Sequence, residues 1–179
     1  MKLLVLFLLI SPYLSSAQLL EWNEYYRLTW DDFQGKPTPV SKGDAGTFVQ
    51  IKAKPYLVGG EAFYDVHAYF DREQSWATEK SRSLLAHEQL HFDIAELYAR
   101  KIRKRIHQLK SEGVKDVSKI NAAVRHLLEE SNEADIRYDA ETLHGSLRSK
   151  QAQWEEKVSN EMASLERFKK PKKIIRVNR

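Results

Sequence analysis

The spacing of apolar residues changes near residue 75, and this change narrows the folds open to the chain. Upstream, residues 48–54 and 61–70 alternate apolar with polar side chains, which is typical of half-buried strands. Downstream, a stripe with a three- or four-residue spacing predicts one long helix that closes near Gly113. Its members are Leu84, His87, His91, Ile94, Tyr98, Ile102, Ile106 and Leu109. Strands followed by helices predict an α+β domain.

The remaining elements follow from turn signals and weaker periodicities. Val58-Gly59-Gly60 predicts a turn that joins the two strands as an antiparallel pair. A third short strand is expected near residues 28–30. A second helix is expected from about Ser118 and a third over roughly residues 145–168. We therefore expect a small antiparallel sheet packed on a long helix, with two further long helices after it.

The N-terminal residues predict a secretory signal. Met1-Lys2 is positive, Leu3–Ile10 is an unbroken apolar run, and small residues precede a cleavage site after Ala17. A membrane anchor would need about 20 apolar residues, and this run has far fewer. We expect an exported protein, periplasmic or extracellular, with one folded domain over residues 18–168 and a basic tail over residues 169–179.

Composition excludes several other classes of protein. The 179 residues include no cysteine, so neither a disulfide scaffold nor a thiolate metal site can form. Hydrophobic residues make up 42% of the chain, which is too many for a disordered protein. Any zinc site must therefore use imidazole and carboxylate ligands, a set that suits catalytic zinc better than structural zinc.

A His-Glu-x-x-His motif lies on the predicted long helix, at residues 87–91. Side chains four residues apart project from the same helix face, so His87 and His91 can bind one zinc ion. Glu88 is adjacent and is expected to act as general base on the attacking water. The alternative is a pair of core histidines that hydrogen-bond to carbonyls or carboxylates. The metal interpretation is favoured because two inward-facing histidines need partners.

The third zinc ligand is expected between residues 138 and 145, where possible ligands are densest. His144 is the first candidate, since imidazole suits zinc and the residue precedes a glycine. Asp139 is the alternative, and Glu141 comes after it. Asp139 and His144 are five residues apart, about 140° around a helix, so both reach the zinc only if the helix ends between them.

These segments resemble a family of uncharacterised bacterial secreted proteins that are described as predicted zinc-dependent proteases. The matching pieces are residues 28–37, 87–93, 138–145 and Trp154. The resemblance implies a zincin-like fold, in which a small sheet lies above the active-site helix and a second helix brings the third ligand. It does not supply a substrate.

The expected function is that of a secreted zinc metallopeptidase that hydrolyses peptide or protein substrates. Zinc would activate the water and Glu88 would accept its proton. An extended substrate is expected to pair with the sheet edge, with the 61–70 strand as the candidate. The alternative is a non-catalytic zinc-binding or surface-interaction module of the same fold, against which the intact Glu88 argues.

Basic residues crowd the second half of the long helix, over residues 100–105, and the C-terminal tail. A helical domain that binds nucleic acid or an acidic surface would use them, but such a run is more often a solvated helix face. Export also makes nucleic acid an unsuitable partner. The sequence does not indicate an oligomeric state.

Overall fold

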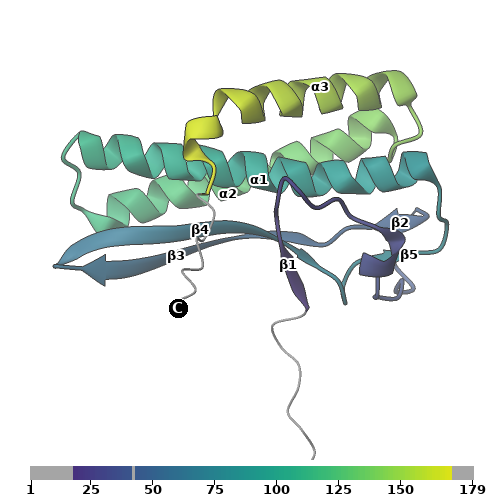
Figure 1. Cartoon of the computed structure of the whole chain (residues 1–179), viewed down its shortest axis with the longest axis horizontal. Helices are drawn as coiled ribbons and strands as arrows, with labels where there is room; N and C mark the ends of the chain where they lie inside the picture. Colours follow the sequence, from purple (N-terminus) through teal and green to yellow (C-terminus); the bar gives the residue numbers. More distant parts are fainter. Residues whose placement is uncertain (1–17, 42, 171–179) are drawn as a thin grey trace, which may run out of the picture.

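The computed structural model describes residues 18–41 and 43–170 (Figure 1). The expected signal, at residues 1–17, and most of the basic tail lie outside these residues. The strands are β1 (Leu19–Glu21), β2 (Ala45–Gly46), β3 (Val49–Val58), β4 (Glu61–Asp71) and β5 (Trp76–Ala77). The helices are η1 (Trp30–Asp32), α1 (Arg82–Ser111), α2 (Val117–Thr142), α3 (Arg148–Ser164) and η2 (Glu166–Phe168).

The main sheet is antiparallel with the strand order β1-β4-β3, and β2 pairs with β5 in a separate short ribbon. Strands β3 and β4 form the expected hairpin, and the alternation of their side chains selects the core face. Val66, Ala68 and Phe70 on β4 are buried against α1, and the β3 residues opposite them pack on the same core.

The third strand is not where the sequence placed it. Residues 30–32 form the single turn η1, and β1 at residues 19–21 completes the sheet instead. The physical reason is local capping: the Asp32 carboxylate accepts hydrogen bonds from the backbone N–H and hydroxyl of Thr29, which closes a turn.

The expected docking edge is also wrong, because β4 is the central strand of its sheet. Strand β1 pairs with its last residues. Where β1 does not reach, side chains from α1 cap the edge: Arg103 donates to the Val66 carbonyl and Lys110 to the Ala62 carbonyl. Charged side chains are a common protection of exposed strand edges. The two edge strands of the sheet are β1 and β3, and β3 is the longer.

Helix α1 is the centre of the molecule, with the sheet on one side and α2 and α3 on the others (Figure 1). One apolar cluster fills the space between the sheet, α1 and the first half of α2. A second cluster lies between α1, α3 and the last turns of α2, and it includes Tyr138 and Trp154. The last turns of α2 are thereby held against the first turns of α1.

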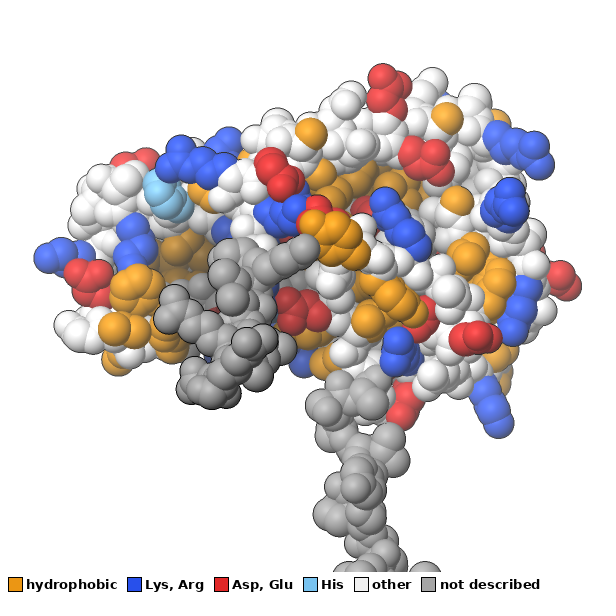
Figure 2. Space-filling model, viewed as in Figure 1, with side chains coloured by type: hydrophobic (Ala, Val, Ile, Leu, Met, Phe, Trp, Pro, Cys, Tyr) orange, Lys and Arg blue, Asp and Glu red, His pale blue; other side chains and the backbone are white. Residues whose placement is uncertain are grey.

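The basic run on α1 is only in part the solvated face that its composition suggested, because Lys104 is exposed whereas Arg100 is buried. Arg100 is 2% exposed and forms an ion pair with the buried Glu96, and Arg103 bonds to the same carboxylate. On the face seen in Figure 2, basic and acidic side chains are interspersed instead of forming one basic patch. Arg100 and Arg103 on α1 therefore have a structural role that requires no binding partner outside the protein.

The expected α+β class, with small antiparallel sheets and three helices, is confirmed. Within residues 18–41 and 43–170, no helix combines the length and the apolar character that crossing a bilayer requires. The zincin-like identity of the fold stays a prediction.

Candidate metal centre

The two motif histidines lie near the start of α1. Ser81, six residues before His87, caps the helix by accepting a hydrogen bond from the Leu84 backbone N–H. This cap fixes where the helix begins. His87 is 1% exposed and His91 is 6% exposed. Their four-residue spacing brings the two rings to 4.8 Å between centroids, nearly perpendicular to each other.

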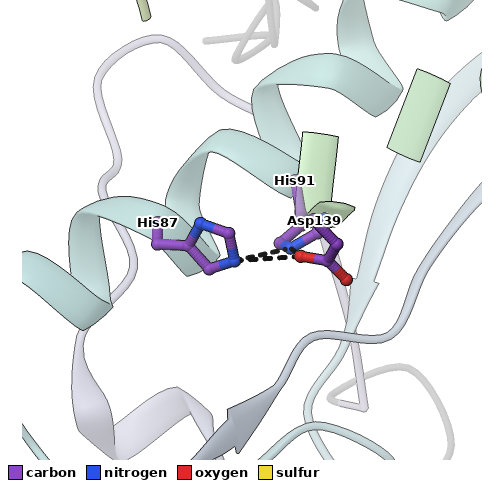
Figure 3. A group of neighbouring side chains, drawn as sticks. All are labelled: His87, His91 and Asp139. Carbon is purple, nitrogen blue, oxygen red and sulfur yellow. Dashed lines mark hydrogen bonds and ion pairs between the residues drawn. The ribbon is translucent and has the colours of Figure 1, made fainter. Parts of the chain in front are cut away.

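Asp139 comes from the last turn of α2 and points between the two histidines (Figure 3). Its Oδ1 atom lies 3.1 Å from Nε2 of His87 and 3.1 Å from Nε2 of His91. The two Nε2 atoms are 3.2 Å apart. Two imidazole nitrogens and one carboxylate oxygen therefore form a nearly equilateral triangle.

The triangle has the dimensions of one face of a tetrahedral zinc site. Bonds of about 2.0–2.1 Å to a central ion place tetrahedral donor atoms about 3.3 Å apart. The three donor distances here, at 3.1–3.2 Å, are close to that value. His87, His91 and Asp139 are thus able to hold a metal ion together. Three protein ligands would leave the fourth tetrahedral position for water or substrate.

The other ring nitrogen of each histidine is held by a hydrogen bond from outside the triangle. The Nδ1–H of His91 donates to Asp135 Oδ1 at 2.6 Å. The Nδ1–H of His87 donates to Gln151 Oε1 at 3.2 Å. Tyr138, which is fully buried, stacks on the His87 ring at 4.6 Å. Such partners fix the ring orientation, so both Nε2 atoms face Asp139.

The charges of the site suit a cation. Burial alone would lower the pKa of His91, but hydrogen bonds to Asp135 and Asp139 and the nearby Glu88 charge raise it to about 10. Burial would raise the pKa of Asp139, but its bonds to the two histidines bring that pKa well below the usual range. Without a metal, protons therefore compensate the carboxylates, and a divalent cation can replace them.

Glu88 lies beside the triangle with an unusual lack of partners. The residue is 3% exposed, yet no side chain or backbone group of the described residues forms a hydrogen bond or ion pair with its carboxylate. Its charge acts on both His91 and Tyr138, so it belongs electrostatically to the same site. Its oxygens are not among the fully buried side-chain atoms that lack a partner, so a water or ligand group at the site can reach them.

The candidate third ligands are separated clearly. Helix α2 ends at Thr142, between Asp139 and His144. The next residues, Leu143 and His144, adopt left-handed backbone angles, φ 50° and 51°, and carry the chain outward. The His144 side chain is 66% exposed and its Nδ1 lies 3.5 Å from Asp139 Oδ2, outside the donor triangle. The geometry thus favours Asp139, the alternative, over His144.

Glu141 has a different role in the structure. Its carboxylate accepts a hydrogen bond from the Trp154 indole at 2.8 Å, which ties the end of α2 to α3. It is not among the residues whose donor atoms converge with those of the two histidines.

Two residues of the site were not found from the sequence. Asp135 had a detectable signal, since it lies four residues before Asp139 and so on the same face of α2. Gln151 had no such sequence signal, because a glutamine on an amphipathic helix does not indicate which side chains it contacts. Helix α2 places Asp139 beside the two histidines, on the element where the third ligand was expected, and it also supplies Asp135, the partner of His91.

Comparisons with known proteins give one family match and no activity. Residues 67–145 match the model of a family described as bacterial protein of unknown function, DUF922. The matched segment runs from β4 to the turn after α2, so it spans His87, His91, Asp135 and Asp139. No curated protein and no solved structure matches the chain.

Proposed function

We propose that this protein is an exported zinc-dependent metallopeptidase whose metal ligands are His87, His91 and Asp139. The observation that carries the proposal is the donor triangle, with its 3.1–3.2 Å sides and its two outer hydrogen bonds at Nδ1. Two nitrogens and one carboxylate oxygen are a ligand set found in catalytic zinc sites, which keep one position open.

The chemistry of the site divides between the ion and Glu88. A bound zinc ion would supply Lewis-acid activation of water and of the substrate carbonyl. Glu88 accepts the proton of the attacking water and delivers it to the leaving amine. Its carboxylate suits this role because it is nearly buried and has no partner among the described residues.

An extended peptide is the substrate class that the surroundings favour. The N–H of Asp71 bonds to the Phe48 carbonyl, so β3 residues of odd number direct their backbone groups away from β4. Val49, Ile51 and Ala53 therefore offer an open edge, which Pro55 limits because it has no N–H. A peptide can add to such an edge through main-chain hydrogen bonds.

The open edge of β3 lies beside the metal centre. A hollow of about 150 Å³ separates them. It is lined by Val49, Gln50, Ile51, His91, Ile94, Ala95, Leu128, Ser131, Asn132 and Asp135. Because His91 and Asp135 share this hollow with β3, a strand bound at the edge would run along the side of the metal centre that these two residues form. This replaces the 61–70 strand, the edge expected from the sequence.

The decisive experiment is Glu88→Gln, with Glu79→Gln, an exposed carboxylate before α1, as the matched control. Purified proteins are loaded with zinc and incubated with a mixture of peptides, and the products are identified by mass spectrometry. We expect cleavage by the wild type and Glu79→Gln, loss of cleavage in Glu88→Gln at unchanged zinc content, and loss of cleavage when a chelator is added.

Two results would contradict the proposal. Cleavage by Glu88→Gln at the wild-type rate would remove Glu88 from the mechanism. Stoichiometric zinc without cleavage of any peptide would instead support the alternative, a non-catalytic zinc-binding module.

A further inference from the structure

We propose that Glu155 is a positioning residue of the metal site, which holds the Gln151 amide in the one orientation that leaves His87 Nε2 free for a metal. The inference rests on the proposed metal site but not on peptidase activity. It concerns a residue of α3 that lies beyond the ligands and beyond their direct partners.

The contacts form a chain from the surface to the ligand. Glu155 is exposed, and its Oε1 accepts a hydrogen bond from Gln151 Nε2 at 2.9 Å. Gln151 is 9% exposed, and its Oε1 accepts from the Tyr138 hydroxyl at 2.8 Å and from His87 Nδ1 at 3.2 Å. His87 itself is 1% exposed.

The orientation of the amide decides the tautomer of His87. The oxygen and nitrogen ends of a glutamine amide have nearly the same shape, so only the pattern of donors and acceptors selects one orientation. Glu155 is an acceptor alone, which draws the amide nitrogen toward it and leaves the oxygen for His87. With the amide reversed, its N–H groups would face His87 Nδ1, which must then accept and shift its proton to Nε2. A protonated Nε2 cannot bind a metal.

The two histidines are thus supported unequally. Asp135 holds His91 directly, and its carboxylate can only accept. His87 depends on an amide that is able to reverse, and Glu155 supplies the carboxylate one step further out. Tyr138 does not replace it, because a hydroxyl can donate to the amide oxygen or accept from the amide nitrogen.

The test exchanges the acceptor for a donor. Glu155→Lys places an ammonium group, which only donates, against the Gln151 amide. Glu156→Lys is the control, because it makes the same charge change at the next exposed residue of α3. We expect the zinc dissociation constant of Glu155→Lys, from competition with a chromophoric chelator, to rise about tenfold or more. Glu155→Gln, whose amide offers both functions, should give a smaller rise, and Glu156→Lys should match the wild type.

A rescue and a spectroscopic signal separate positioning from general structural damage. The double variant combines Glu155→Lys with Gln151→Glu. Its new carboxylate at position 151 accepts from His87 and pairs with the new ammonium group, so zinc affinity should recover. The ¹⁵N chemical shifts of the His87 ring in the metal-free protein report its tautomer separately from any activity. We expect the population with a proton on Nδ1 to fall in Glu155→Lys and to return in the double variant.

The inference is overturned by any of three results: wild-type zinc affinity and tautomer in Glu155→Lys, an equal loss in Glu156→Lys, or no recovery in the double variant. Failure of the protein to cleave peptides would contradict the proposed function and would leave this inference standing, since neither measurement uses a substrate.

Discussion

Asp135 and His91 are joined by a hydrogen bond of 2.6 Å between Oδ1 and Nδ1. Asp135 lies one helical turn before Asp139 on α2, and His91 lies one turn after His87 on α1. The same pair of helices thus supplies all three proposed metal ligands and the partner that orients one of them. The site depends on how α1 and α2 pack over these two turns.

Asp135→Asn should lower the affinity for zinc by about 10–100-fold, the usual effect of losing a carboxylate partner of a ligating histidine. The amide still accepts a hydrogen bond, but it no longer adds negative charge to the His91 ring. Isothermal titration with zinc measures the change, and Glu133→Gln, an exposed residue of the same helix, is the control. Equal affinities of Asp135→Asn and the wild type would contradict the assigned role.

Asp139→Ala and His144→Ala discriminate between the two candidate third ligands. Removal of a ligand should weaken zinc binding by at least about 100-fold, while the exposed His144 should matter by less than about threefold. Metal content after dialysis against a weak chelator reads out the difference. The opposite order, with His144→Ala losing the metal, would restore the ligand that the sequence favoured.

The pKa of His91 predicts how the metal-free protein responds to pH. Its folded-state value, about 10, lies above the ordinary 6.5, so the protonated ring stabilises the fold fully below about pH 6.5. This contribution is lost as the pH rises toward 10. Urea unfolding of metal-free protein should show a falling free energy of unfolding across that window, and His91→Gln should remove the slope.

Zinc binding should also release protons, because the ion replaces the one on His91. Titrations in buffers of different ionisation enthalpy count the protons released, and about one is expected near pH 7.5. An absence of proton release at that pH would show that His91 is already neutral in the metal-free protein.

The part of the site that depends on one helix could be predicted from the sequence. The spacing of His87 and His91 on a strong helical period determines both their common face and their direction. The choice between Asp139 and His144 could not be predicted, because the position of His144 depends on the backbone angles after Thr142. Left-handed angles at Leu143 and His144 are disfavoured for such residues, and no sequence pattern announces them.

The fold shows the same division between local and long-range information. The β3–β4 hairpin and the three helices follow from periodicity and turn residues. The position of β4 at the centre of the sheet does not, since it depends on pairing with β1, about 50 residues away along the chain. The docking edge expected from the sequence was wrong for that reason.

Glu96→Ala should destabilise the protein by about 3–5 kcal/mol, the range found when a buried ion pair loses one partner. Glu96 is 3% exposed and is the carboxylate that both Arg100 and Arg103 contact. Its removal leaves the buried Arg100 with the exposed Glu166, a backbone carbonyl and the Trp22 ring as its partners. Thermal or denaturant unfolding measures the loss, and zinc affinity should change little because the metal centre lies on earlier turns of α1.

Gly145→Ala should weaken both the fold and the metal site, for separable reasons. Gly145 has φ +79°, which strains any other residue by about 1–2 kcal/mol. A Cβ atom there would also lie 2.9 Å from Cβ and Cγ of His87, too close for the ring to keep its place.

Gly113→Ala is a matched control, because Gly113 has φ +78° and an added Cβ there meets no atom within 4 Å. Both variants should therefore lose similar stability from backbone strain, whereas only Gly145→Ala should lose zinc affinity. Chelator competition and denaturant unfolding on the same samples test this, and equal zinc affinity in the two variants would show that His87 can shift without cost to the site.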